Sequence, residues 1–344
     1  MVISLREIDL SKYNIHTDLV HDLIKEIPKC EEKIEFDGGF ISRVHLESED
    51  AKKIKRKEGE YTTIYYDDIT DSNNFKRVNG ILNEELNLIF SKMKIKKEYS
   101  CMIIGLGNEN IACDLLGPLT TSKVIVTRHI YEEGGLEEGF RVTSSFIPGV
   151  MGDTGIETFD IIKNLVSFVK PDFVIVIDAL ASENIDKLLK TIQICSTGIS
   201  PGSALNNKRK ELSFDTLGIP VLSIGVPTIV SGVTLVSDTL NYMMKHFSFN
   251  IKNKDNFGLK LIPNTKIDYL KNNNYSLDEE EKNFFLGAFG TLSNFEKKAL
   301  INDVLTPIGY NLLVTPKEID FITVKLSDLI SSSLNFVLHN ISTK

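Results

Sequence analysis

Short apolar runs alternate with amphipathic stretches through the middle third of this 344-residue chain. Four runs have the composition of buried strands: 101–104, 124–126, 173–177 and 221–224. Between and after them, apolar residues recur at helical spacing at about 154–169, after residue 182 and at about 237–246. Because strands and helices alternate, the sequence predicts an α/β fold.

The segments on either side of this middle third carry different patterns. They comprise predicted strands at 34–48 and 60–69, a predicted helix at 79–95, a polar stretch at 249–283 and predicted helices at 278–305 and 316–338. We therefore expect a single domain with its core at about 98–248 and peripheral elements at 19–97 and 249–344. The amino-terminal additions are rich in strands, and the carboxyl-terminal additions are helical.

The composition narrows the classes of function. The chain has 39 basic and 47 acidic residues, a formal net charge of −8, which argues against nucleic acid as a direct partner because phosphate binding needs concentrated Lys and Arg. Four cysteines form neither a CxxC motif nor a Cys/His cluster, so no disulfide framework or zinc site is expected. With no signal-peptide core and no transmembrane-length run, we expect a cytoplasmic protein without membrane contact.

Two aspartates, Asp114 and Asp178, each follow an apolar, strand-like stretch. Parallel strands of an open sheet present their carboxyl ends at one edge, where such folds place their chemistry. Two carboxylates held close together titrate apart, so that one ionises while the other keeps its proton, which suits acid/base hydrolysis. The alternative readings are a surface or capping carboxylate for Asp114 and a helix cap or loop-bracing acid for Asp178.

A glycine turn containing Gly105, Gly107 and Asn108 follows the first core strand. A dinucleotide-binding loop would need a third glycine at position 110, which is Asn110, so the motif is incomplete. The turn either binds an anion or allows close backbone approach to a substrate or a neighbouring loop.

A second glycine-rich loop contains Gly152 and Gly155. Loops of this kind often line the site at a sheet edge, although ordinary turn chemistry explains them equally well. Asp153, Thr154 and Gly155 also match the pepsin-like signature, but they precede a strongly helical segment. We therefore expect Asp153 or Thr154 to cap that helix, which has Glu157 at the capping-box position.

Three further candidates carry reactive or charged groups. Lys208 and Arg209 belong to a basic cluster that either holds an acidic substrate side chain or is simply solvated. His129 follows a predicted strand and is a candidate for the site edge. Cys113, next to Asp114, is a possible thiol nucleophile without an evident activating histidine. No histidines are paired at metal-ligand spacing, so the residues predict neither a metal site nor a cofactor.

Taken together, the motifs resemble the germination protease family, endopeptidases that degrade small acid-soluble spore proteins. The matching runs lie in order at 105–108, 114–118, 126–129, 148–152, 154–158, 177–181, 201–203, 207–210, 216–220, 224–228 and 314–319. The resemblance implies a three-layer αβα core with a mostly parallel sheet, related to the hydrogenase-maturation peptidases. It also implies an atypical aspartic mechanism, in which the family's two catalytic aspartates fall on Asp114 and Asp178.

Family membership carries further expectations about processing and assembly. The family's processing sequence aligns with the chain at Asp18 and Leu19, which predicts cleavage between them, a propeptide at 1–18 and a peptidase domain at 19–344. A homotetramer in the cytoplasm of the spore core, acting on small acid-soluble spore proteins without a cofactor, is also implied.

Two departures from the family pattern lie near the predicted site. Ala112 and Cys113 replace an expected Thr-Pro pair that would stiffen the loop before Asp114, and Asp153 replaces an uncharged residue. Two other functions stay open: a metal-dependent peptidase of the maturation type, and a non-catalytic α/β module that binds an anion at the glycine turn.

Overall fold

The computed structural model describes residues 17–23, 27, 30–200, 210–252, 275–305 and 312–341. They divide into two compact units: a larger one with the described residues of 16–229 and 315–344, and a smaller one with those of 230–314. The expected propeptide at 1–18, followed by a single peptidase domain, stays a prediction.

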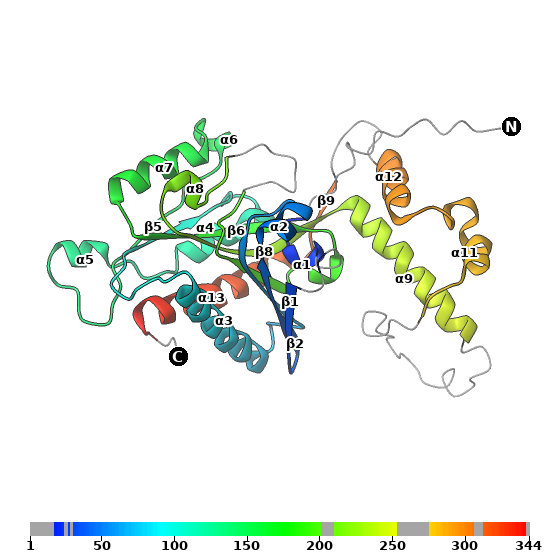
Figure 1. Ribbon diagram of the computed structural model, residues 1–344, viewed down its shortest axis with the longest axis horizontal. Helices are drawn as coiled ribbons and strands as arrows, with labels where there is room; N and C mark the ends of the chain where they lie inside the picture. Colours follow the sequence, from blue (N-terminus) through cyan, green and yellow to red (C-terminus); the bar gives the residue numbers. More distant parts are fainter. Residues whose placement is uncertain are drawn as a thin grey trace. The chain divides into compact units, whose positions relative to one another are not determined.

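The larger unit is built on a mixed β-sheet (Figure 1). Its strands are β1 (Glu31–Phe36), β2 (Gly39–Leu46), β3 (Gly59–Tyr66), β4 (Cys101–Gly105), β5 (Thr143–Phe146), β6 (Phe173–Ser182), β7 (Thr191–Cys195) and β8 (Val221–Ser231). They are ordered β1-β2-β3-β7-β8-β6-β4-β5. β4 is parallel to β5 and β6, and the pairs β1–β2, β2–β3, β3–β7 and β7–β8 are antiparallel. The predicted α/β fold with a parallel core is confirmed, and the amino-terminal strands extend the same sheet.

Helices cover both faces of this sheet, with α3 and α13 on one side and α7 and α8 on the other (Figure 1). The helices of the larger unit are α1 (Val20–Leu23), α2 (Ser48–Lys53), α3 (Ser72–Lys92), η4 (Ala112–Asp114), α4 (Leu116–Thr121), α5 (Arg128–Glu132), α6 (Met151–Thr154), α7 (Thr158–Val169), η5 (Ile185–Lys187), α8 (Phe214–Leu217) and α13 (Ile319–His339). This arrangement gives the three predicted layers.

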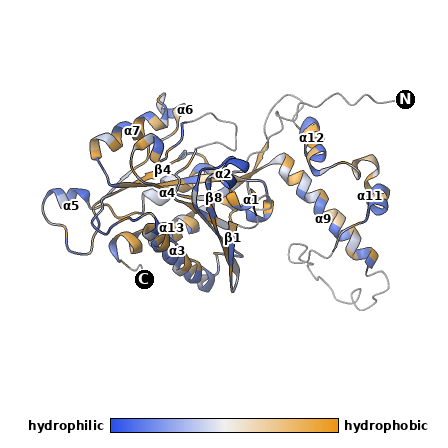
Figure 2. Ribbon diagram, in the orientation of Figure 1, coloured by the Kyte–Doolittle hydropathy of each residue, from blue (hydrophilic) through white to orange (hydrophobic). Residues whose placement is uncertain are grey.

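The core forms where alternate strand residues meet the apolar stripe of a helix. On one face, Ile104 of β4 and Val176 of β6 pack with Phe159, Ile162 and Val166 of α7. Figure 2 shows that the flanking helices carry both hydrophobic and hydrophilic residues. Since each helix buries its apolar stripe and exposes the opposite side to solvent, the sheet is enclosed between two layers of helices.

The long carboxyl-terminal helix α13 packs against α3 and α4. Among the described residues it is the one helix long and apolar enough to cross a membrane, but 56 % of its most apolar window is buried inside the protein. Asn79 of α3 donates hydrogen bonds to Ser332 Oγ (2.7 Å) and Ser333 Oγ (2.9 Å) of α13. α13 is therefore a core helix of the layer that covers one face of the sheet.

The smaller unit consists of α9 (Gly232–Lys252), α11 (Glu279–Leu286), η7 (Gly287–Phe289), α12 (Asn294–Leu305) and β9 (Leu313–Val314). β9 pairs antiparallel with Val230 and Ser231, the last two residues of β8. Phe247 of α9 stacks on Phe285 of α11 with ring centroids 4.6 Å apart. The helical carboxyl-terminal addition is thus confirmed.

Three predicted elements are wrong. Residues 124–126 form no strand, because the Ile125 N–H donates to the side chain of Asn335 (2.9 Å) instead of to a neighbouring strand. The predicted helix from Thr154 is split by Gly155, whose φ of +70° ends α6, so that α7 begins later. No helix opens at residue 182, since β6 continues through Ser182 and only the short η5 follows.

Candidate active site

β4 ends beside the middle of β6, and the two strands pair in parallel register up to that point. Gly105, the last residue of β4, pairs with Ile177 of β6, and the Leu106 N–H donates to the Ile177 carbonyl oxygen (2.8 Å). Asp178 comes directly after Ile177, and the glycine turn comes directly after Gly105. The structure therefore places Asp178 beside the turn that leads to Asp114.

Asp178 is a buried strand residue with 7 % of its surface exposed. Because strand side chains alternate between faces, it lies on the same face as Val176 and Leu180. That face is covered by α7 at Val176. The Ala179 N–H donates to Asp178 Oδ1 (2.9 Å). A buried carboxylate of this kind is suited to proton transfer because little water competes for it.

Asp114 ends η4 and is half-buried. Its Oδ2 accepts a hydrogen bond from the Asn108 N–H (2.9 Å), which ties the carboxylate to the glycine turn. The preceding residue is fixed from another strand, because Thr228 Oγ1 of β8 donates to the Cys113 carbonyl oxygen (2.6 Å). Asp114 is thus held by the glycine turn and by β8, in the short helix η4 that packs against β6.

Both glycines of the first turn are required by close backbone contact. A Cβ on Gly107 would lie 2.0 Å from the Asp114 carbonyl oxygen, and a Cβ on Gly105 would lie 2.4 Å from the Gly117 carbonyl oxygen. Gly107 also has a φ of +125°, which L side chains rarely adopt. The geometry matches close approach to a neighbouring loop, and the backbone N–H of Asn108 is directed to Asp114.

The second glycine-rich loop reaches the same edge through Asp153. Asp153 is exposed in α6, and its Oδ2 accepts a hydrogen bond from Asn108 Nδ2 (3.1 Å). Asn108 therefore joins the carboxylates of Asp114 and Asp153. The expected capping role of Asp153 or Thr154 is wrong, because Glu157 occupies the N-cap of α7. Gly152 and Gly155 belong to this exposed loop, and a Cβ on either would meet nothing within 4 Å.

His129 lies at the opposite end of β4. It is exposed in α5, close to Thr127, whose N–H donates to the Thr143 carbonyl oxygen (2.9 Å). Thr143 pairs with Cys101, the first residue of β4, whereas the aspartates lie beyond the last. The structure does not bring His129 to the aspartates. The candidates Lys208 and Arg209 lie outside the described residues.

Cys113 is a poor thiolate in this setting. Partial burial, and then the neighbouring charge of Asp114, raise the pKa of its thiol. Because the thiolate is the nucleophilic form, these surroundings disfavour cysteine chemistry here. Within the described part of the chain, no three His, Cys, Asp or Glu side chains gather closely enough to hold a metal ion.

The predicted processing site lies against the strand that carries Asp178. The Asp18 N–H donates to the Ala181 carbonyl oxygen (3.0 Å), and the Ala181 N–H donates to Asp18 Oδ2 (2.9 Å). Gln193 Nε2 of β7 donates to the Asp18 carbonyl oxygen (3.1 Å). Leu19 is fully buried. The bond between Asp18 and Leu19 is thus held by β6 and β7.

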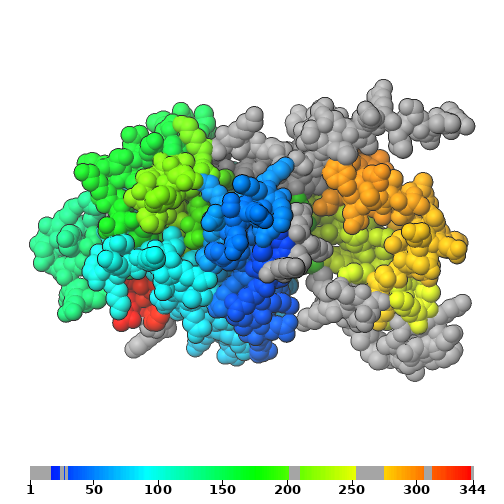
Figure 3. Space-filling view, in the orientation of Figure 1, coloured from blue at the N-terminus to red at the C-terminus, as the bar shows by residue number. Residues whose placement is uncertain are grey.

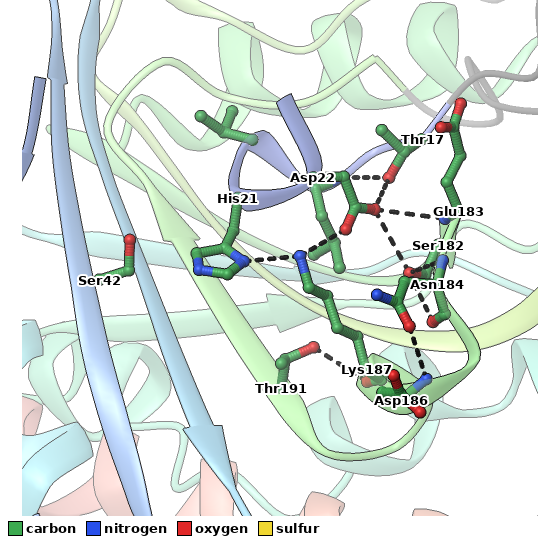
Figure 4. Close-up of polar contacts among 12 residues, drawn as sticks. Thr17, His21, Asp22, Ser42, Ser182, Glu183, Asn184, Asp186, Lys187 and Thr191 are labelled. Atoms are coloured by element: carbon green, nitrogen blue, oxygen red, sulfur yellow. Dashed lines mark hydrogen bonds and ion pairs between the residues drawn. The ribbon is translucent and has the colours of Figure 1, made fainter. Parts of the chain in front are cut away.

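A buried ion pair anchors the residues after this bond (Figure 4). Lys187 Nζ lies 2.5 Å from Asp22 Oδ1 and 2.6 Å from His21 Nδ1. Asp22 Oδ2 also accepts from Ser182 Oγ (3.3 Å) and from the Glu183 N–H (3.2 Å). The segment 17–23 is therefore attached to the loop that follows β6.

Several residues of this region were missed from the sequence. Thr228, Gln193 and Lys187 act through partners 115 to 175 positions away, which a local pattern does not reveal. For Gln193 one signal exists, since a polar residue interrupts the apolar alternation of β7 at a position that is 5 % exposed. A buried polar side chain requires a partner, which Gln193 finds in the backbone of residues 18–20.

Comparison with known proteins agrees with the motif-based resemblance. A model of the germination protease family matches residues 12–344. The germination protease of Geobacillus sp. (strain WCH70) is 43 % identical over 359 residues, and that of Bacillus thuringiensis subsp. konkukian (strain 97-27) is 42 % identical over 351 residues. In both cases the alignment covers 97 % of this chain and 96 % of the relative.

Among solved structures, the NiFe hydrogenase maturation protease HycI from Thermococcus kodakarensis KOD1 aligns with 38 % of this chain and 75 % of its own, at 16 % identity and a TM-score of 0.25. The family assignment depends on the family match and on the near full-length relatives. The chain belongs to the germination protease family and is an endopeptidase.

Proposed function

We propose that this endopeptidase begins the degradation of small acid-soluble spore proteins at germination and that Asp114 and Asp178 activate the attacking water. The observation that supports the proposal is the parallel pairing of β4 with β6 up to Gly105 and Ile177, because Asp178 follows Ile177 and the turn that hydrogen-bonds Asp114 follows Gly105. Supporting contacts come from Asn108 and Thr228, which fix the loop of Asp114.

In the proposed mechanism, one carboxylate removes a proton from water as the water attacks the scissile carbonyl carbon. The other carboxyl group protonates the carbonyl oxygen or the leaving amine. Two acids in different surroundings suit this division: Asp178 is buried in a strand whereas Asp114 is half-buried at the end of η4, although each accepts one backbone hydrogen bond. Proton transfers of this kind typically accelerate a reaction by about 10²- to 10⁴-fold each.

We further propose that the chain is made as a zymogen that cleaves itself between Asp18 and Leu19. The contacts of Asp18 with Ala181 and Gln193 hold the bond close to the strand of Asp178. Since Leu19 is fully buried, hydrolysis requires the segment 17–23 to detach at least locally from β6 and β7.

Other proposed properties follow from the family. They are a homotetramer, a location in the cytoplasm of the spore core, action without a cofactor, and no direct contact with nucleic acid or membrane. The organisation with a propeptide at 1–18 and a single peptidase domain at 19–344 belongs to the same group of proposals.

The direct test is digestion of a purified small acid-soluble spore protein by the full chain, with fragments identified by mass spectrometry. We expect cleavage after acidic residues that precede apolar ones, unaffected by a metal chelator, and loss of residues 1–18 from the enzyme itself. Cleavage abolished by the chelator would replace the aspartic mechanism with the metal-dependent one. An intact substrate under all conditions would contradict the proposed function.

A further inference from the structure

A polar cavity of about 260 Å³ lies on the sheet face that carries the side chain of Asp178. Its floor crosses the sheet from Tyr61 of β3 through Cys195 of β7 and Gly225 of β8 to Leu180 of β6. Leu180 lies two residues after Asp178, so both side chains are on one face. The cavity is therefore adjacent to the proposed catalytic edge.

One rim of this cavity is basic, because Lys55, Arg56 and Lys57 line it. Lys57 is already neutralised, since its Nζ lies 2.6 Å from Glu211 Oε1 and 2.5 Å from Asp215 Oδ2. Figure 3 shows this contact on the surface, where residues near 55 lie beside residues near 215.

Arg56 has unused donor capacity. Its Nη2 donates to the carbonyl oxygen of Thr17, whereas its Nε is buried without a hydrogen-bond partner among the described residues. A buried guanidinium N–H that lacks a partner is costly unless another group satisfies it. This donor therefore points to a ligand with an acceptor, and a carboxylate is the acceptor that a guanidinium binds best.

The chain turns between the end of α2 and Arg56. Lys55, two residues after the last residue of α2, is in the left-handed region at a φ of +52°, and the Arg56 N–H donates back to the Ala51 carbonyl oxygen (2.8 Å). This conformation is unfavourable for a residue other than glycine.

The cavity already contains an acidic residue of the same chain. Asp18 lines it, and the Asp18 backbone is held by the carbonyl oxygen of Ala181 in β6 and by the side chain of Gln193 in β7. Leu19, which follows, is fully buried. The bound sequence is thus an acidic residue followed by an apolar one, and its acidic residue makes two hydrogen bonds with Ala181 on the strand of Asp178.

We propose that this cavity is the subsite for the acidic side chain that precedes the scissile bond of a peptide substrate, and that Arg56 determines the preference for a carboxylate. Asp18 occupies the subsite in the unprocessed chain, and Asp or Glu of a substrate replaces it later. This assignment rests on the proposed peptidase function, because the cleaved bond would lie against β6, the strand that carries Asp178. Ala181 and Gln193 would bind the substrate backbone, and Arg56 would bind the carboxylate of the acidic side chain.

The first experiment needs no catalysis. The rate of hydrogen exchange of the Leu19 and Val20 amides is compared in four full-length proteins. They are the wild type, Asp18→Asn, Arg56→Gln and the double variant. Asparagine keeps the acceptor for the Ala181 N–H but removes the charge. We expect Asp18→Asn to increase the exchange rate about tenfold when Arg56 is present, and less than about threefold in the Arg56→Gln background. The difference arises because the substitution removes a charged interaction with Arg56 only in the protein that contains Arg56.

The second experiment measures kcat/KM for two peptides that differ only by Glu or Gln before the scissile bond. We expect the wild type to prefer Glu by about tenfold or more, Arg56→Gln to lose the preference and Arg56→Lys to keep part of it. Lys53→Gln is the matched control, because Lys53 is a basic residue only three positions before Arg56, is 60 % exposed and does not line the cavity. It should retain the wild-type preference.

The two experiments separate the two proposals. Cleavage of both peptides with equal efficiency by the wild type would overturn the subsite while leaving the peptidase function intact. If Arg56→Gln does not fold, the comparison of the Glu and Gln peptides in the wild type still tests whether the subsite prefers a carboxylate. Absence of cleavage together with charge-dependent exchange after residue 18 would support the acid-binding cavity and contradict the proposed function.

Discussion

His21 makes the stability of the amino-terminal segment depend on pH. Its Nδ1 lies 2.6 Å from the ammonium group of Lys187, so the ring accepts a hydrogen bond there and is neutral in the folded chain. Burial, and then the charge of Lys187, lower the pKa of His21 from 6.5 to about 4. Glu31 and Asp22 act in the opposite direction but do not outweigh these effects.

The sign of the effect follows from proton binding. Below pH 6.5 the unfolded chain protonates His21 while the folded chain does not, so the free energy of unfolding falls as the pH decreases towards 4. Because one pKa unit corresponds to about 1.4 kcal/mol, the difference between 6.5 and about 4 amounts to about 3 kcal/mol. Above pH 6.5 this contribution is constant.

The assay is urea unfolding of the wild type, His21→Gln and His45→Gln between pH 7 and pH 4. Glutamine can still accept a hydrogen bond from Lys187 but does not titrate, so His21→Gln should lose about 3 kcal/mol less than the wild type over this range. His339, whose pKa is also lowered by burial, contributes equally in all three proteins. His45 has a side chain 58 % exposed and serves as the control. Identical pH dependence in wild type and His21→Gln would refute the reasoning.

Two substitutions test other contacts. Thr228→Val removes the hydrogen bond to the Cys113 carbonyl oxygen. We expect the free energy of unfolding, measured by chemical denaturation, to fall by about 1–3 kcal/mol and kcat to decrease. An unchanged kcat would show that this bond does not position Asp114. Arg43→Met leaves Glu85, which is 2 % exposed and accepts two hydrogen bonds from Arg43, as a buried acid without its partner. We expect a loss of about 3–5 kcal/mol, and a loss below about 1 kcal/mol would contradict it.

The sequence predicts the sheet core well where burial is complete. Every residue of β4 and all but Ala179 of β6 are buried, so their apolar runs identify them as strands. β5 escapes prediction because its polar sequence from Thr143 to Phe146 becomes a strand only by pairing with β4. The helix predicted after Ser182 fails for a related reason, since Leu189 adopts a φ of +58° and the chain turns directly into β7.

The site residues that local sequence predicts likewise differ from those that depend on contacts distant in the sequence. Asp114 and Asp178 are found because each follows a recognisable apolar run, and the parallel pairing of β4 with β6 places the end of β4 beside Ile177. Asp178 itself lies within β6, which continues through Ser182. The contacts of Thr228 and Arg56 depend on elements brought together only by folding, so a local pattern cannot reveal them. His129 is mispredicted because a segment that follows an apolar run need not lie at the carboxyl end of a strand.

The most direct test of the central claim is the rate of substrate cleavage by Asp178→Asn, measured beside Asp114→Asn and Asp153→Asn. Asp153 contacts Asn108 but is exposed, which makes it a matched acidic control at the same edge. If Asp114 and Asp178 transfer the protons, both of their variants should lose at least about 10²-fold in kcat while staying folded, and Asp153→Asn should lose far less. Activity of folded Asp178→Asn within a few-fold of the wild type would contradict the account.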